Sequence, residues 1–283
     1  MKKRKISCLA WLCLISILYQ GNGFAQVSEG TLKNCPIKNF VKTVGGDLLH
    51  VASSPLRMSK NDGLRLLIVT TITAGFVARV DSPIDEEFGI EVDDAYWLPA
   101  QGLARIGEVY DQISPEGFST ALSIAMLTGG VAFRDKKLLE TTRLMIESSL
   151  ITHFITTWSK DLFGRSRPYT GKGPHHFELF ASKGAQEFRS MPSGHVSSAF
   201  SVMTVIAKRY DKWWVKIPAY TFAISVAFQR MNSRTHWASD VIIGAGIGYW
   251  VGSTLVNRQP DKSKSSSFSP YLLGNRIGLL VNF

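Results

Sequence analysis

Apolar residues gather in six stretches along the chain, each long enough to form a helix. The stretches span residues 64–78, 118–133, 138–160, 195–210, 217–231 and 239–256. Alanine, leucine, isoleucine and methionine outweigh the alternating pattern that is typical of strands, and few helix breakers interrupt the runs. The pattern predicts an all-α protein, built as a bundle of about six helices.

Three segments outside these stretches have a different pattern. Residues 81–94 are rich in aspartate and glutamate, with no repeated ligand spacing and no calcium-loop pattern, so we expect a solvated loop there. Residues 259–269 are polar and rich in serine and lysine, which is typical of a linker. From residue 276 to 283 every second side chain is apolar, and this period of two predicts a short strand-like C-terminal tail.

The apolar runs are marginal as membrane spans. Most uninterrupted runs stay near 15 residues, and polar side chains such as Glu147 lie midway along some of them. A spanning helix usually needs about 17–25 apolar residues. The mean hydropathy of +0.05 lies between typical values for soluble and polytopic proteins. Buried bundle helices and short membrane spans therefore both remain open.

The N-terminus has the order of a secretory signal peptide. Basic residues 2–5 precede an apolar run from Ile6 to Leu18, and Gly23-Phe24-Ala25 places small residues at a cleavage site. The run is shorter than the roughly 20 residues of a membrane-spanning anchor. We therefore favour cleavage after Ala25 over an uncleaved anchor, and expect an exported protein, in the periplasm or at the periplasmic face of a membrane.

The net charge of +10 includes the four basic residues of this N-terminal segment, and the remainder is still basic. Such a balance suits an anionic substrate or an anionic membrane surface. Nucleic acid is not expected as a partner, because no basic stripe with interleaved aromatic residues occurs. Cys8 and Cys13 fall in the expected signal peptide, which leaves Cys35 alone and predicts no internal disulfide.

Three short stretches carry candidate chemistry. Residues 160–168 follow a helical run and hold Lys160 and Arg167 seven residues apart. Residues 192–195, Pro-Ser-Gly-His, form a turn before an apolar helix, and residues 230–240 enter another helix. Taken singly, each stretch has an ordinary structural explanation, such as a helix N-cap at Ser193 or an i,i+4 pair between His236 and Asp240.

Together the three stretches contain what phosphoryl transfer requires. Transfer needs fixed cations and N–H donors around three charged oxygens, and the cations here are Lys160, Arg167 and Arg230. The helix that begins near Ser193 offers unsatisfied N–H groups, and Gly194 lets them approach a phosphate.

The histidines complete the set. His236 can act as nucleophile while Asp240, one helical turn later, orients its ring. His195 can protonate the leaving oxygen and then activate water.

These stretches resemble the three signature motifs of the type 2 phosphatidic acid phosphatase superfamily, which includes bacterial class A acid phosphatases and vanadium haloperoxidases. The matching positions are Lys160, Arg167 and Pro168 of the first motif, residues 192–195 of the second, and Arg230, His236 and Asp240 of the third. The resemblance covers roughly residues 61–257. One position departs from it, because the serine of the third motif is Gln229 here, and this puts one minor phosphate contact in doubt.

The resemblance implies an all-α bundle of the phosphatidic acid phosphatase and haloperoxidase type, with the site at the ends of core helices and no metal or other cofactor. We then expect a signal peptide at 1–25, an N-terminal extension at 26–60, a catalytic domain at 61–257, and a linker and tail at 258–283.

The leading hypothesis is a phosphatase that hydrolyses phosphomonoesters or pyrophosphates, lipid-linked and with possible membrane association, through a phosphohistidine on His236. The alternatives are a soluble periplasmic acid phosphatase acting on small phosphomonoesters, a vanadate-dependent haloperoxidase, and an inactive envelope scaffold.

Overall fold

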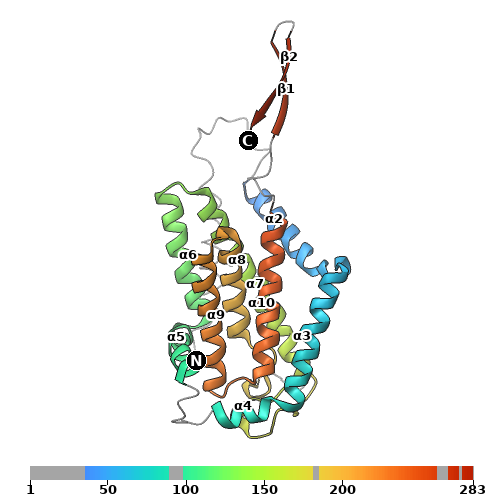
Figure 1. The fold of residues 1–283 in the computed structure, drawn as a ribbon, viewed down its shortest axis with the longest axis vertical. Helices are drawn as coiled ribbons and strands as arrows, with labels where there is room; N and C mark the ends of the chain where they lie inside the picture. The colour runs from blue at the N-terminus through green and yellow to red at the C-terminus, as the bar shows by residue number, and fades with distance from the viewer. Residues whose placement is uncertain (1–35, 89–97, 181–184, 260–266, 274–275, 283) are drawn as a thin grey trace.

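The computed structural model describes residues 36–88, 98–180, 185–259, 267–273 and 276–282. Over these ranges the chain is an all-α bundle followed by a small β-hairpin, which confirms the predicted fold class. The expected signal peptide lies outside the described residues. Figure 1 shows the longest helices side by side along the long axis of the molecule.

Five long helices match the predicted apolar stretches and make up the centre of the bundle. They are α6 (Pro115–Ala132), α7 (Lys136–Phe163), α8 (Gly194–Tyr210), α9 (Trp213–Asn232) and α10 (Ala238–Arg258). The helix predicted at 64–78 is α3 (Lys60–Arg79), which packs against α10. Single-turn 3-10 helices are present at Ser54–Arg57, Pro168–Thr170 and Gln186–Phe188.

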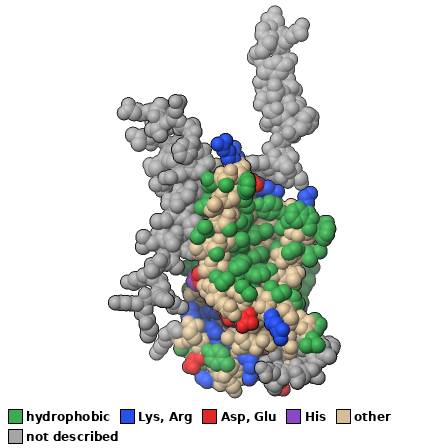
Figure 2. Space-filling view, turned by 90° about the vertical axis from the view of Figure 1, so that its left-hand side faces the viewer, with side chains coloured by type: hydrophobic (Ala, Val, Ile, Leu, Met, Phe, Trp, Pro, Cys, Tyr) green, Lys and Arg blue, Asp and Glu red, His purple; other side chains and the backbone are tan. Residues whose placement is uncertain are grey.

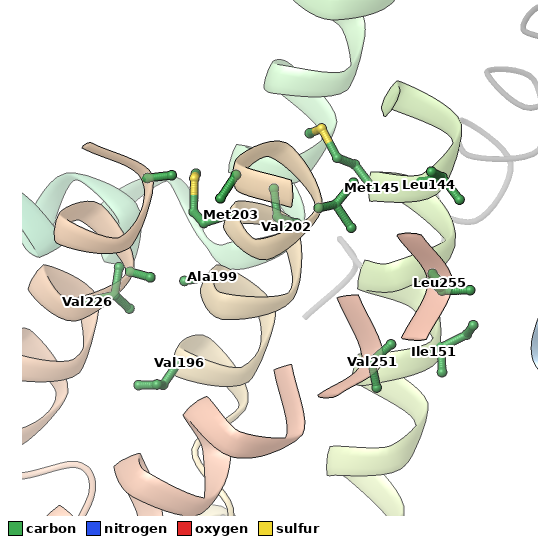
Figure 3. Packing of buried hydrophobic residues seen from close by; sticks show 14 of the residues in the cluster. Leu144, Met145, Ile151, Val196, Ala199, Val202, Met203, Val226, Val251 and Leu255 are labelled. Atoms are coloured by element: carbon green, nitrogen blue, oxygen red, sulfur yellow. The ribbon is translucent and has the colours of Figure 1, made fainter. Parts of the chain in front are cut away.

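Helix α8 is the central helix, and it packs against α7, α9 and α10. Its buried face is made of small and β-branched side chains, such as Val196, Ala199 and Val202, which are at most 1% exposed. Figure 3 shows these side chains together with those of α7 and α10. Small side chains let the axes of α7, α9 and α10 approach α8 closely. The ends of these four helices therefore lie near one another.

Glycines on α10 give the closest of these approaches. A Cβ atom at Gly248 would lie 2.3 Å from the carbonyl oxygen of Ser197, and one at Gly252 would lie 2.7 Å from that of Ser201. Both contacts are with the backbone of α8. The pairing continues to the start of both helices, where the amide of Ser193 donates to the carbonyl of Asp240 over 3.0 Å.

Three further helices were not predicted as such. They are α2 (Pro36–Ala52), α4 (Asp81–Phe88) and α5 (Leu98–Ile113). Helix α4 corrects the expectation of a solvated acidic loop, at least for its own residues, because Asp81 is 1% exposed and buried against Arg165. Helix α5 packs along α9.

The C-terminal strand has a partner. Strand β2 (Arg276–Asn282) pairs antiparallel with β1 (Ser267–Leu273), with Ser267 opposite Asn282 and Leu273 opposite Arg276. The sequence predicted the second strand but assigned the first residues of β1 to a linker.

Large apolar side chains cover much of the bundle surface. Figure 2 shows one face on which hydrophobic side chains form a continuous area, with most of the visible charged side chains near its ends. Within the described ranges one helix, α10, is long and apolar enough to cross a membrane, and half of its apolar window is buried in the bundle. Helices α3 and α4, joined through a 62° bend, would add a second such segment if they form one span. Core helices of soluble proteins pass the same test.

Candidate active site

The predicted site residues come together at one end of the bundle. Helices α7 and α9 end there, and helices α8 and α10 begin there. The N-termini of α8 and α10, which are the positive ends of their dipoles, thus lie near Lys160 and Arg230 in the last turns of α7 and α9. The residues concerned are Lys160, Arg167, Ser193, Gly194, His195, Arg230, His236 and Asp240.

Gly164 fixes the end of α7 between the two cations of the first motif. Its φ of +56° is left-handed, and its amide donates to the carbonyl of Lys160 over 3.0 Å. A Cβ atom here would lie 1.7 Å from the carbonyl oxygen of Glu178, so only glycine fits. The chain then reverses, and Lys160 lies against the start of α8, where a Cβ on Gly194 would be 3.7 Å from its Nζ atom.

The start of α8 holds a buried hydroxyl without a partner. Ser193 stands at the N-cap position, but its side chain makes no capping hydrogen bond, and its Oγ atom is buried and unpaired among the described residues. The Nε atom of Arg167 is in the same condition. Buried donors are normally satisfied, so these two groups favour an anionic ligand at this end of the bundle.

Asp240 is held by a fully buried arginine that sequence reasoning left without a role. Arg165 is 0% exposed, and its guanidinium donates to Asp240 Oδ1 over 2.6 Å and to Asp81 Oδ2 over 2.7 Å. Ser190 Oγ and the Trp237 amide donate to Asp240 Oδ2 over 2.5 and 3.0 Å. The charge of Asp240 is thus compensated inside the bundle.

His236 lies in the turn between α9 and α10 and is almost wholly buried. Its Nδ1 atom is 3.8 Å from Asp240 Oδ2, which is too long for a hydrogen bond, and it has no other partner among the described residues. The expected His236–Asp240 pair is therefore adjacent but not bonded. Its other ring nitrogen, Nε2, is the one turned away from the Asp240 contact.

Burial and positive charge set the protonation states in the site. Burial lowers the pKa of His236 well below its ordinary value, and the charges of Lys160 and Arg167 lower it further. Burial and the neighbouring Arg167 also lower the pKa of Lys160, to about 7. An uncharged His236 is the form that can act as a nucleophile.

A carboxylate outside the motifs faces the same site. Asp111, on α5, ion-pairs with Arg230, and its Oδ1 atom is 3.3 Å from Nε2 of His195. Gln229 Nε2 donates to Asp111 Oδ2 over 3.1 Å, and Gln229 Oε1 accepts from Arg230 Nε over 2.6 Å. The hydrogen bond with His195 holds the pKa of Asp111 down, at about 2.

Comparison with known families agrees with this geometry. Residues 142–264 match the PAP2 superfamily, a stretch that includes all eight predicted site residues. That segment, less than half of the chain, matches the PAP2 superfamily and carries the site. In PAP2 terms, Gln229 stands where the resemblance places a serine, and its side chain binds Arg230 and Asp111 instead of lying free.

Two curated proteins share segments with this chain. Lipid A 1-phosphatase of Porphyromonas gingivalis is 36% identical over 80 residues, which cover 25% of this chain and 18% of that protein. Maleate isomerase of Alcaligenes faecalis is 30% identical over 104 residues, 36% of this chain and 40% of that protein. The match therefore spans less than half the length of either relative. One relative is named as a phosphatase and the other as an isomerase.

A solved structure, that of Aquifex aeolicus LpxE, is more distantly similar. It has a TM-score of 0.45 and 20% identity, and the match covers 63% of this chain and 95% of that chain. A TM-score this low supports no argument about activity.

Sequence reasoning found the motif residues but missed their supports. Asp111 and Asp81 lie far from the motifs in sequence, and nothing local marks them as site residues. Arg165 lies within the first motif stretch and Ser190 lies two residues before the second, so their polar side chains could have been recognised as candidates from their position alone. Groups of three or more potential metal ligands do not occur in the described part of the chain.

Proposed function

We propose that this protein is a phosphatase that hydrolyses phosphomonoesters or pyrophosphates through a phosphohistidine intermediate on His236. One observation carries the proposal. Three cationic side chains and two histidines meet at one end of the bundle, where the buried Nε of Arg167 and Oγ of Ser193 have no partner in the part of the chain that the structure describes. A phosphoryl group would satisfy those donors and balance the charge.

In the first step Nε2 of His236 attacks phosphorus and the bond from phosphorus to the leaving oxygen breaks. His195 in its protonated form gives its proton to that oxygen. In the second step the oxygen of a water molecule attacks phosphorus while His195 takes a proton from that water. The phosphorus–nitrogen bond breaks, phosphate leaves, and His236 returns to its neutral form.

The cations perform the electrostatic work of both steps. Lys160, Arg167 and Arg230 neutralise the non-bridging oxygens, and the amides at the start of α8 donate to them. Because these groups are fixed by the bundle, little reorganisation accompanies the reaction. This arrangement supports a reaction that needs no metal ion.

A lipid-linked phosphate is the substrate class that the observations favour. A segment 36% identical to a protein named lipid A 1-phosphatase supports a phosphorylated lipid. The exposed apolar faces of α3, α5 and α9 support contact with a membrane, where such a substrate resides. The signal-peptide pattern of residues 1–25 supports export, with the site at the periplasmic face of that membrane.

The experiment that tests the proposal is phosphate release in the presence of EDTA, from a phosphorylated lipid in mixed micelles and from a small soluble phosphomonoester. We expect release to survive chelation, and to fall by about a thousandfold or more in His236→Ala. His153→Ala, an exposed histidine on α7, is the matched control and should retain activity.

A radiolabelled phosphoryl group that is trapped on the wild-type protein and absent from His236→Ala would identify the intermediate. Full activity in His236→Ala would show that the nucleophile is another group. Preference for the soluble ester would favour the soluble acid phosphatase over the lipid enzyme.

A further inference from the structure

The start of α8 and the end of α9 share one carboxylate that belongs to neither helix. Asp111 lies on α5, and its two oxygens are divided between them. Oδ1 lies 3.3 Å from Nε2 of His195, while Oδ2 ion-pairs with Arg230 and accepts from Gln229. A single side chain thus contacts the acid–base histidine and a phosphate-binding arginine.

Close packing of α5 on α9 places this carboxylate. Gly107 lies one helical turn before Asp111, and a Cβ atom there would be 2.3 Å from the carbonyl oxygen of Ser225 on α9. Residues four apart lie on the same face of a helix, so the contact at Gly107 turns Asp111 toward α9. The side chain of Asp111 remains 35% exposed, so it could have turned toward solvent, yet it contacts His195 and Arg230.

Gln229 completes the arrangement on the arginine side. Its amide donates to Asp111 and its carbonyl accepts from Nε of Arg230, so that the guanidinium is held from two directions. A serine at this position would be too short to make both contacts. The glutamine that replaces the serine of the motif at position 229 is therefore matched by Asp111 on α5, which accepts its hydrogen bond.

We propose that Asp111 is a positioning residue for the proposed phosphatase reaction, which holds the ring of His195 in one orientation and, with Gln229, fixes the guanidinium of Arg230. The inference rests on the proposed function for its catalytic meaning. A carboxylate that accepts from one ring nitrogen fixes the tautomer and makes the imidazolium form more favourable.

Because cations surround His195, its contact with Asp111 affects the pKa of the ring. The groups that face it are Asp111 and Tyr110 of α5, Arg230 of α9, Lys160 of α7, and His236. Burial lowers the pKa of His195, the two cations lower it further, and Asp111 is the group that raises it. Without Asp111, His195 would keep its proton only at lower pH, so a smaller fraction of it would be protonated near neutral pH and able to donate to the leaving oxygen.

The test is an NMR titration of the histidine side chains in the full chain, with the His195 signal assigned by its loss in His195→Gln. In Asp111→Asn we expect the pKa of His195 to fall by about one unit. Glu108→Gln removes the same charge from an exposed position of α5 and should leave the His195 titration unchanged. An unchanged His195 pKa in Asp111→Asn would overturn the proposal.

Kinetics separate the two contacts. Asp111→Asn should lower kcat/KM by about 10- to 100-fold and move the alkaline limb of its pH profile to lower pH, with partial recovery in Asp111→Glu. Gln229→Ala should raise KM and leave the His195 titration where it is in the wild type. Equal effects of both variants on the His195 pKa would contradict the division of roles.

The two proposals fail separately. If the wild type releases no phosphate but Asp111→Asn still shifts the His195 titration, the proposed function is wrong and the positioning contact stands. If the wild type is active and Asp111→Asn changes neither the titration nor the pH profile, the positioning role is wrong and the phosphatase stands.

Discussion

Lys160 places an ammonium group where three other cations surround it. Arg167, Arg189 and Arg230 each lower its pKa, after the larger effect of burial, and Asp240 opposes them only in part. Its Nζ atom also donates to the carbonyl of Arg189 over 3.0 Å. The charged form of Lys160 destabilises the folded protein on its own and is stabilised when an anion binds beside it. Such a trade of stability for activity is common at functional sites.

Burial of the Lys160 ammonium should make the stability of the fold depend on pH. Its pKa is about 7 in the folded protein against 10.5 as the ordinary value, so between these values the unfolded chain binds a proton that the folded chain lacks. Stability then rises with pH through that window, and the penalty of the buried charge is largest below about pH 7. Lys160→Met should therefore melt at a higher temperature than the wild type at pH 6, and the difference should shrink toward pH 10.

Adding orthovanadate or phosphate should reverse the order at pH 6, because the ligand stabilises the wild type and not the variant. Lys172→Met, an exposed lysine in the loop after the first motif, is the control and should change neither result. A Lys160→Met protein that is less stable than the wild type at every pH would refute the argument.

The individual residues of the site were predictable to the extent that their spacing in sequence reflects local geometry. Gly194 and His195 follow a helix start, and Asp240 follows His236 by one turn, so a short pattern captures each. Asp111 and Asp81 reach the site through tertiary packing of α5 and α4, and no local pattern encodes that. The missing His236–Asp240 hydrogen bond has a similar cause, because Arg165, Ser190 and the Trp237 amide occupy the carboxylate.

At the scale of helices, the apolar pattern located the five central helices and α3 but missed α5. The reason is that the buried face of α5 combines the small residues Ala104 and Gly107 with a single large one, Tyr110, while large apolar residues such as Ile106 and Val109 are exposed. A search for large apolar residues on a buried face finds only a weak signal in such a helix. Small residues let two helices approach closely, because the interaxial distance depends on the side chains at the contact. Helix α10 packs against α8 in the same way.

The α8–α10 contact leads to a prediction with an internal control. A methyl group at Gly248 would lie 2.3 Å from the backbone of α8, whereas one at Gly246 would lie 3.5 Å from a side-chain methyl of Val69, which is an ordinary van der Waals contact. Gly248→Ala should destabilise the protein by about 1–3 kcal/mol through overpacking. Gly246→Ala should be neutral or stabilising, because alanine favours a helix over glycine by about 1 kcal/mol.

Thermal or chemical denaturation of the two variants beside the wild type measures the difference. Because α8 and α10 also carry Ser193 and Asp240 at their starts, Gly248→Ala should lower phosphate release as well. If both alanine variants behave alike, the helices are not in the close contact described above.

At the scale of the whole molecule, the distribution of apolar side chains separates two environments. Helix α3 exposes Leu64, Leu67 and Ile68, each 48% or more accessible. Exposed apolar side chains on this scale, repeated on α5 and α9, exceed what scattered surface residues of a soluble protein require. The site end of the bundle, in contrast, is lined by charged groups that need water or an anionic ligand. A lipid with a phosphorylated head group would match both parts.

A charge placed in this apolar area tests the membrane contact. If α3 faces hydrocarbon, Leu67→Asp introduces a carboxylate there at a cost of about 2.5–3.5 kcal/mol, and recovery of the full chain in washed membranes should fall severalfold. Lys60→Asp, at the first residue of the same helix, is the control and should be recovered like the wild type. If α3 faces water instead, Leu67→Asp should keep the wild-type melting temperature and be recovered unchanged, and the wild type itself should pass into the aqueous fraction after a carbonate wash. That result would show that the apolar surface of α3 does not contact lipid, and would favour a soluble ester as the substrate of the site.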